Sequence, residues 1–143
     1  MNRRAFLAGA GITLSTAGAG CLSRIPGIGP DVSFERVDAQ YDVDSPPEIA
    51  VENGTVIVRG TVAYGATDCS DLELAHAEYE RSQERLDLLV AGVDDRNWPG
   101  GGCNDDAMIQ GYRVEATRSG GFRYVSATEH HSQGSTYSAS FER

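Results

Sequence analysis

Lysine is absent from this chain. Its 12 basic side chains are all arginines, and they stand against 21 aspartate and glutamate residues, which gives a formal net charge of −9 over 143 residues. Binding to nucleic acid depends on clusters of basic side chains that neutralise phosphates. The acidic surplus therefore argues against a nucleic-acid partner.

The same imbalance predicts a dependence on salt. At 1 M salt the Debye length is about 3 Å, so surface carboxylates scarcely repel one another, whereas in dilute buffer they push the compact state apart. A lysine-free, carboxylate-rich composition is typical of proteins from salt-loving archaea. We therefore predict that the fold loses structure when salt is dialysed away. Circular dichroism from molar to millimolar salt is the measurement, and an unchanged spectrum would contradict the prediction.

No apolar run is long enough to span a bilayer, which takes about 20 strongly apolar residues. An apolar stretch at residues 5–19 is rich in glycine and alanine and follows the pair Arg3 and Arg4. A paired arginine, a weakly apolar middle and a small-residue end are the features of a twin-arginine export signal. We expect residues 1–20 to be this signal, and not a permanent anchor helix.

The expected signal ends in a sequence similar to a lipobox, Gly18-Ala19-Gly20-Cys21. Leucine usually stands where Gly18 does, but small residues before the cysteine suit a peptidase that must approach the backbone closely. We expect cleavage before Cys21 and lipid attachment to its thiol. The alternative is plain cleavage nearby, with secretion into the medium. Residues 21–31, rich in proline and glycine, would form a flexible tether.

Cysteine is scarce: apart from Cys21, the chain contains only Cys69 and Cys103. If Cys21 carries lipid, two thiols are left, and in an exported protein an even number of thiols favours a disulfide. In the chain-entropy model such a bridge would stabilise the fold by about 4 kcal/mol. A pair of metal-binding thiolates is the alternative, although the close CxxC spacing of such sites is missing.

Recognisable catalytic motifs are missing as well. The chain has no GxSxG nucleophile elbow, no HExxH zinc motif and no phosphate-cradling glycine loop before a helix. We therefore expect no enzymatic activity and no cofactor. A small extracellular hydrolase is kept as a second alternative function.

Two segments invite a metal-binding interpretation. His130 and His131 are adjacent, but neighbouring strand residues point to opposite faces, so one ion takes both only if the strand has ended. Four aspartates also flank one loop without the regular spacing of a calcium-binding loop: Asp94, Asp95, Asp105 and Asp106. Solvated surface residues are the simpler interpretation of both segments, and we expect no metal site.

Two further residues are candidates for surface roles. Asn53, in Asn53-Gly54-Thr55, is a candidate N-glycosylation site that coincides with a turn signal. Trp98 is the only tryptophan and lies in a glycine-rich loop, where it either packs on the core or anchors a partner.

The rest of the chain has the sequence pattern of short β-strands separated by turns. Apolar and polar residues alternate on both sides of Asn53-Gly54, which predicts a hairpin because both turn positions need a positive φ. Gly60, inside the second of these strands, predicts a bulge or a close backbone approach. Residues 70–93 fit either a helix or two strands around a turn at 81–83. Alternation predicts other strands over 32–37, 108–116, 122–130 and 137–141.

Several segments follow one another in an order that resembles a known group of proteins. They are Gly60-Thr61-Val62 before Cys69, Ala77-Glu78-Tyr79 and Leu86-Asp87-Leu88 before the second cysteine, and Gly111–Ala116 and Val125–His130 after it. This order resembles small exported lipoproteins of halophilic archaea over roughly residues 48–131. The resemblance implies an immunoglobulin-like sandwich, two strands over 71–93 and a bridge between Cys69 and Cys103. It implies no catalytic residue.

The predicted architecture is all-β. We expect a signal peptide at 1–20, a lipid-anchored tether at 21–31, and a small antiparallel, immunoglobulin-like β-sandwich of about 6–8 strands at 32–143.

The predicted function is that of a cell-surface lipoprotein on the outer face of the membrane, held there through lipid on Cys21. We expect a non-catalytic binding or structural module with an unidentified protein or polymer partner, and residues 64–70 and 94–106 as its binding edge. The first alternative is a solute- or metal-binding lipoprotein that uses His130 and the loop acids.

Overall fold

The computed structural model describes residues 29–65, 70–94 and 108–143. Within these ranges the chain forms eight strands and no helix, so none of the described segments is a helix suited to crossing a membrane. The strands are β1 (Asp31–Val37), β2 (Glu48–Glu52), β3 (Thr55–Tyr64), β4 (Ser70–Glu80), β5 (Arg85–Asp94), β6 (Met108–Thr117), β7 (Tyr124–His130) and β8 (Thr136–Glu142).

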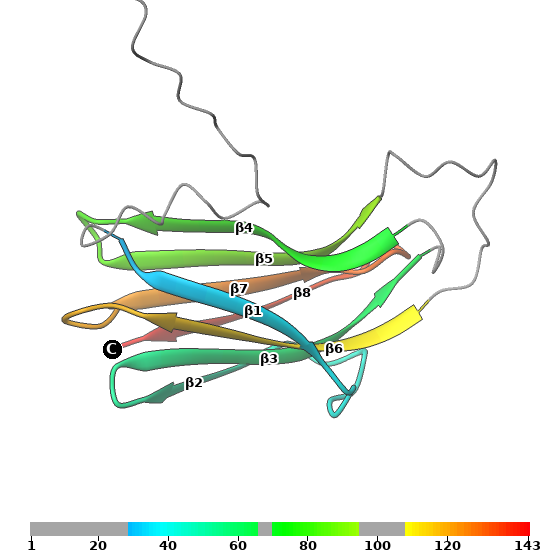
Figure 1. Cartoon of the computed structure of the whole chain (residues 1–143), viewed down its shortest axis with the longest axis horizontal. Helices are drawn as coiled ribbons and strands as arrows, with labels where there is room; N and C mark the ends of the chain where they lie inside the picture. The colour runs from blue at the N-terminus through cyan, green and yellow to red at the C-terminus, as the bar shows by residue number, and fades with distance from the viewer. Residues whose placement is uncertain (1–28, 66–69, 95–107) are drawn as a thin grey trace, which may run out of the picture.

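The strands form two four-stranded sheets that pack as two layers (Figure 1). The first sheet has the order β1-β6-β3-β2 and the second has the order β4-β5-β7-β8. This arrangement confirms the predicted small β-sandwich. All neighbouring strands run antiparallel except β5 and β7, which run parallel. Parallel neighbours need a crossover connection, and β6 in the opposite sheet supplies it.

The core lies between the layers because apolar and polar residues alternate along the strands. Leu72 and Leu86 of the second sheet are fully buried, as are Val62 and Ala116 of the first. Burying one such leucine or valine side chain contributes about 1.5–3 kcal/mol. Other buried apolar residues that share this core are Val56, Val58, Leu88, Val90, Val114, Val125 and Ala127.

The turns follow the local sequence signals. Asn53 and Gly54 adopt φ angles of 52° and 80°, and Glu52 pairs with Thr55 across them. The predicted two-residue hairpin is therefore confirmed. Gly120 and Gly121, at φ angles of 87° and 71°, turn the chain between β6 and β7.

Residues 70–93 form two strands, β4 and β5, and not a helix. They pair as an antiparallel hairpin, with a register shift between Leu74 and His76. The strand interpretation prevails because Leu72, Leu86 and Leu88 all face the first sheet and are buried there. Packing on a partner sheet outweighs the intrinsic helix preference of a leucine-rich segment.

The connection between β1 and β2 crosses the first sheet, because these strands lie at its opposite edges. It passes closely over the outer face of β6. A Cβ added to Gly111 would lie 2.5 Å from the carbonyl oxygen of Asp38. The Gln110 side-chain amide also donates a hydrogen bond to the carbonyl of Val37, at 2.7 Å. Residues 38–41 therefore lie over one end of β6.

Candidate functional site

Three polar side chains meet inside the sandwich. Tyr112 comes from β6 in the first sheet, Glu129 from β7 in the second, and His131 follows β7 directly. Their exposed fractions are 1%, 0% and 8%. Burial of an ionisable carboxyl is costly unless partners satisfy it. We call these three residues the interior polar cluster.

Hydrogen bonds connect the members of the cluster. The Tyr112 hydroxyl donates to Oε1 of Glu129 at 2.7 Å, and Nε2 of His131 lies 3.3 Å from Oε2 of the same carboxyl. The backbone N–H of Ala63 donates to Nδ1 of His131 at 3.2 Å. A backbone amide can only donate, so the hydrogen-bond pattern assigns the imidazole proton to Nε2, where it faces Glu129.

The end of β7 is also tied to the first sheet through the backbone. The N–H of Ser132 donates to the carbonyl of Ala63 at 2.8 Å. Ala63 therefore holds the chain on both sides: its N–H binds the His131 ring and its carbonyl binds the next residue. This clamp fixes the ring of His131 against Glu129.

Burial shifts the protonation equilibria of Glu129 and Tyr112 toward their uncharged forms. It raises the pKa of Glu129 above the ordinary 4.5, while the hydrogen bonds from Tyr112 and His131 act in the opposite direction. Burial also raises the pKa of Tyr112, and the charge of Glu129 adds to that effect. The Tyr112 hydroxyl is thus held as a hydrogen-bond donor.

Gly60 makes room for the cluster. It pairs with Tyr112 across β3 and β6, and its α-carbon faces the core. A Cβ at this position would overlap Oε1 of Glu129 and lie 2.8 Å from the Tyr112 hydroxyl. The close backbone approach predicted from this glycine is therefore confirmed, and what approaches is the buried carboxyl.

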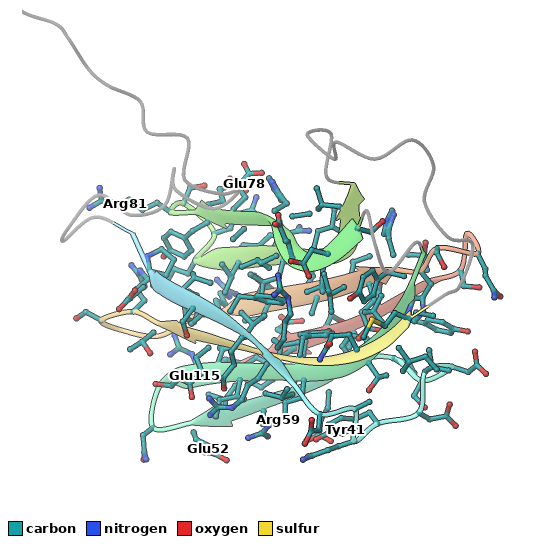
Figure 2. The ribbon with its side chains drawn as sticks, turned by 45° about the vertical axis from the view of Figure 1, so that its right-hand side comes forward. Tyr41, Glu52, Arg59, Glu78, Arg81 and Glu115 are labelled. Atoms are coloured by element: carbon teal, nitrogen blue, oxygen red, sulfur yellow. The ribbon has the colours of Figure 1, made fainter. Side chains whose placement is uncertain are left out.

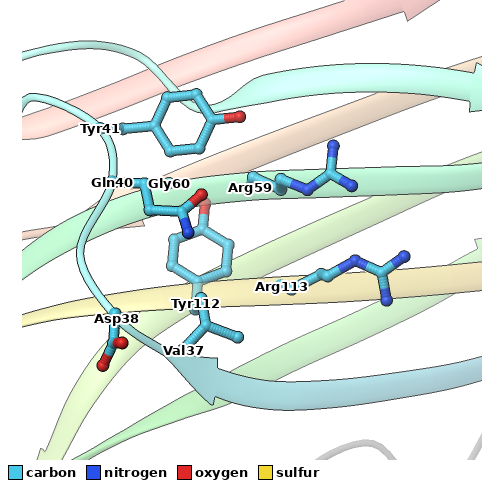
Figure 3. A pocket seen from close by; sticks show the side chains of 8 residues that line it. All are labelled: Val37, Asp38, Gln40, Tyr41, Arg59, Gly60, Tyr112 and Arg113. Carbon is cyan, nitrogen blue, oxygen red and sulfur yellow. The ribbon is translucent and has the colours of Figure 1, made fainter.

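Two hollows lie beside the cluster. The first, of about 410 Å³, is at the end of the sandwich and is lined by Tyr64, Gly65, Ser70, Ala91, Gly92, His130, His131 and Ser132. The second, of about 230 Å³, lies over β3 and β6 beneath residues 38–41 (Figure 3). Its lining is Val37, Asp38, Gln40, Tyr41, Arg59, Gly60, Tyr112 and Arg113.

The two adjacent histidines border the same hollow because β7 ends at His130. Both ring nitrogens of His131 are nevertheless engaged, one by Ala63 and the other by Glu129. The described part of the chain contains no group of three histidine, cysteine, aspartate or glutamate side chains placed to hold a metal ion. His131 is therefore part of the interior hydrogen bonding.

Replacing Tyr112 by phenylalanine removes one of the two donors to Glu129. We expect Tyr112→Phe to lower the free energy of unfolding by about 1–3 kcal/mol, because a buried carboxyl loses its closest partner. The matched control is Tyr79→Phe. The Tyr79 hydroxyl is buried and has no hydrogen-bond partner among the described residues, so its removal should be neutral or slightly stabilising. Urea unfolding at constant molar salt measures both, and equal losses would contradict this account.

Of the residues predicted from sequence as sites, Asn53 lies in the described part. It is exposed at the tip of the β2–β3 hairpin, as a modified residue must be. Arg3, Arg4, Cys21, Cys69 and Cys103 lie outside the described residues. The same holds for Trp98, for Asp95, Asp105 and Asp106, and for most of the predicted binding edge.

The interior polar cluster was not predicted from the sequence. One signal did point to it: Glu129 continues the alternation of Val125 and Ala127, which places a carboxyl on the buried face of β7. Gly60 of β3, which has no side chain, was the signal for the space that the Glu129 carboxyl occupies. Their proximity depends on how two distant strands face each other, and no local pattern reports that.

Comparison with known proteins gives no further identification. No protein-family model, curated protein or solved structure matches this chain.

Proposed function

We propose that this chain is an exported, lipid-anchored β-sandwich that serves as a non-catalytic binding or structural module at the surface of a salt-adapted cell. The observation that supports a non-catalytic role is the state of the interior polar cluster. Tyr112, Glu129 and His131 are buried and are hydrogen-bonded to one another. They contribute to the fold and present no free nucleophile or base to solvent.

The surface supports adaptation to salt. Several of the described arginines form ion pairs that are largely exposed, such as Arg36 with Asp71 at 2.6 Å and Arg85 with Asp87 at 2.9 Å. Exposed pairs of this kind contribute little to stability. At least nine of the 21 carboxylates have no arginine to offset them, since only 12 arginines are available. Screening by salt is the remaining way to relieve their repulsion.

Anchoring rests on the N-terminal sequence and on the length of the tether. β1 begins at Asp31, where the expected tether of residues 21–31 ends. A fully extended stretch of about ten residues spans at most about 33–36 Å. A lipid on Cys21 would therefore leave the whole sandwich clear of the membrane surface and free to meet a partner.

The intact mass of the protein from native membranes tests this proposal. We expect a chain that begins at Cys21 and carries lipid, and whose mass rises by two hydrogen atoms on reduction because Cys69 and Cys103 are bridged. Sugar mass that is lost in Asn53→Gln would assign the glycan. The variant Cys21→Ser should appear in the medium, and Arg3→Lys combined with Arg4→Lys should stay inside the cell. An unlipidated native chain would overturn the anchored module.

A further inference from the structure

A half-buried pair of arginines lies on the outer face of the first sheet. Arg59 of β3 and Arg113 of β6 are direct register partners, and both line the hollow of about 230 Å³. Like charges placed directly opposite each other in a sheet are destabilising. Two of the 12 arginines are therefore neighbours at a position where their charges repel each other. Figure 2 shows Arg59 near Tyr41 on this side of the sandwich.

The two guanidinium groups differ in their partners. Arg113 forms ion pairs with Glu115 on its own strand and with Glu35 of β1, the latter at 3.6 Å. Arg59 is half-buried and has no ion pair or hydrogen bond among the described residues, although Glu48 of β2 is its register neighbour. The free donors of Arg59 are therefore available to an outside acceptor.

The rest of the hollow is suited to a small organic ligand. Gln40 and Tyr41 form the opposite wall. Gly60 and Tyr112 form the floor, where the Tyr112 hydroxyl is hydrogen-bonded to Glu129. In Figure 3 the Asp38 carboxylate lies on the other side of the hollow from both guanidinium groups. A guanidinium binds a carboxylate through two parallel hydrogen bonds, an amide adds a polar contact, and an aromatic ring packs on an apolar face.

We propose that this hollow binds a small ring compound that carries a carboxylate, with Arg59 as the principal contact to the anion and Tyr41 against the ring. The volume of about 230 Å³ is below that of common drug-sized sites. It suits a ligand the size of one monosaccharide, or one acidic unit of a polymer. This inference goes beyond the proposed surface module by giving it a ligand class.

Ligand-observed saturation-transfer NMR on the mature protein, purified from whichever fraction of the native culture contains it, tests the site in molar potassium chloride. The probe is glucuronate, and glucose is its neutral counterpart. We expect a saturable signal from glucuronate and none from glucose. Arg59→Gln should abolish the signal. Arg123→Gln should preserve it, because Arg123 lies over the ring of Tyr124 at 5.3 Å and away from the hollow.

Each other outcome overturns the proposal. No saturable signal, or a signal that persists in Arg59→Gln, would rule out this site. Equal displacement of glucuronate by inorganic sulfate would show a general anion site with no preference for a ring carboxylate. Circular dichroism of both variants confirms that they are folded. This inference adds a ligand to the proposed surface module. Because the intact mass reports anchoring and does not depend on ligand binding, failure of ligand binding and failure of the surface-lipoprotein proposal remain distinguishable.

Discussion

Replacing Gly60 by alanine is expected to destabilise the sandwich by about 3 kcal/mol. The added methyl group would overlap Oε1 of Glu129 and crowd the hydroxyl and ring of Tyr112. Both side chains are fully buried and are held by hydrogen bonds. A shift of either side chain away from the methyl group would disturb the hydrogen bond between them. The substitution therefore combines overpacking with the loss of a buried hydrogen bond.

Gly65→Ala is the matched control for this substitution. A Cβ at Gly65 would lie 3.5 Å from the Cβ of Ser132, which is ordinary van der Waals contact. Its unfolding free energy should stay within about 0.5 kcal/mol of the original. Urea unfolding at constant molar salt is suitable because urea leaves the screening of surface charge unchanged. Equal midpoints for the two variants would show that the carboxyl does not need the space at Gly60.

The parts of the fold that were predictable from sequence are those with local causes. The Asn53-Gly54 turn needs two positive φ angles, and few residue pairs adopt them readily. The alternation of apolar and polar residues along β6 and β7 predicts which face of each strand is buried, because successive side chains of a strand point to opposite faces. The parallel pairing of β5 with β7 has no such local signal. It arises because the chain leaves the second sheet after β5, forms β6 in the first sheet and returns as β7.

The ambiguity over residues 70–93 has a physical source in β4. Leu72 and Leu74 face the core before the register shift, and Ala77 and Tyr79 pack on it afterwards. The extra residue of a bulge changes the phase of the alternation. Apolar residues then recur three positions apart across the bulge, and this spacing imitates one face of a helix. Pattern alone could not separate the two structures.

The candidate sites were less predictable than the fold. Arg59 and Arg113 are 54 positions apart, and only the β3–β6 register makes them neighbours. Glu129 reaches Tyr112 across two sheets that no local signal relates. The sequence showed each of these residues as one charged or polar side chain among many. Their contacts depend on pairings that form only in the folded chain.

Removal of the Glu129 carboxyl is expected to produce the largest loss of stability. Glu129→Ala leaves a cavity in the core. It also leaves two buried hydrogen-bond donors without an acceptor, the Tyr112 hydroxyl and Nε2 of His131. We expect a loss of about 3–5 kcal/mol from these effects together. Urea unfolding at constant salt measures it. Glu129→Gln retains the volume and one acceptor, so it should lose much less.

The pH dependence of Glu129→Gln separates the carboxyl's charge from its packing. Burial raises the pKa of Glu129 in the folded state above 4.5, so the fold favours the protonated form. Its contribution to stability is complete below about pH 4.5 and declines as pH rises through the raised pKa, because the unfolded chain ionises first. The decline amounts to about 1.4 kcal/mol for each unit by which the pKa is raised.

Glutamine cannot ionise, so this decline should be absent from Glu129→Gln. The stability of the variant relative to the original chain should therefore increase as pH rises from about 4.5. Exposed carboxylates are common to both chains and cancel in the comparison. A difference that is constant with pH would mean that Glu129 titrates as it does in the unfolded chain. In that case, the hydrogen bonds from Tyr112 and His131 would fully offset the cost of burying its charge.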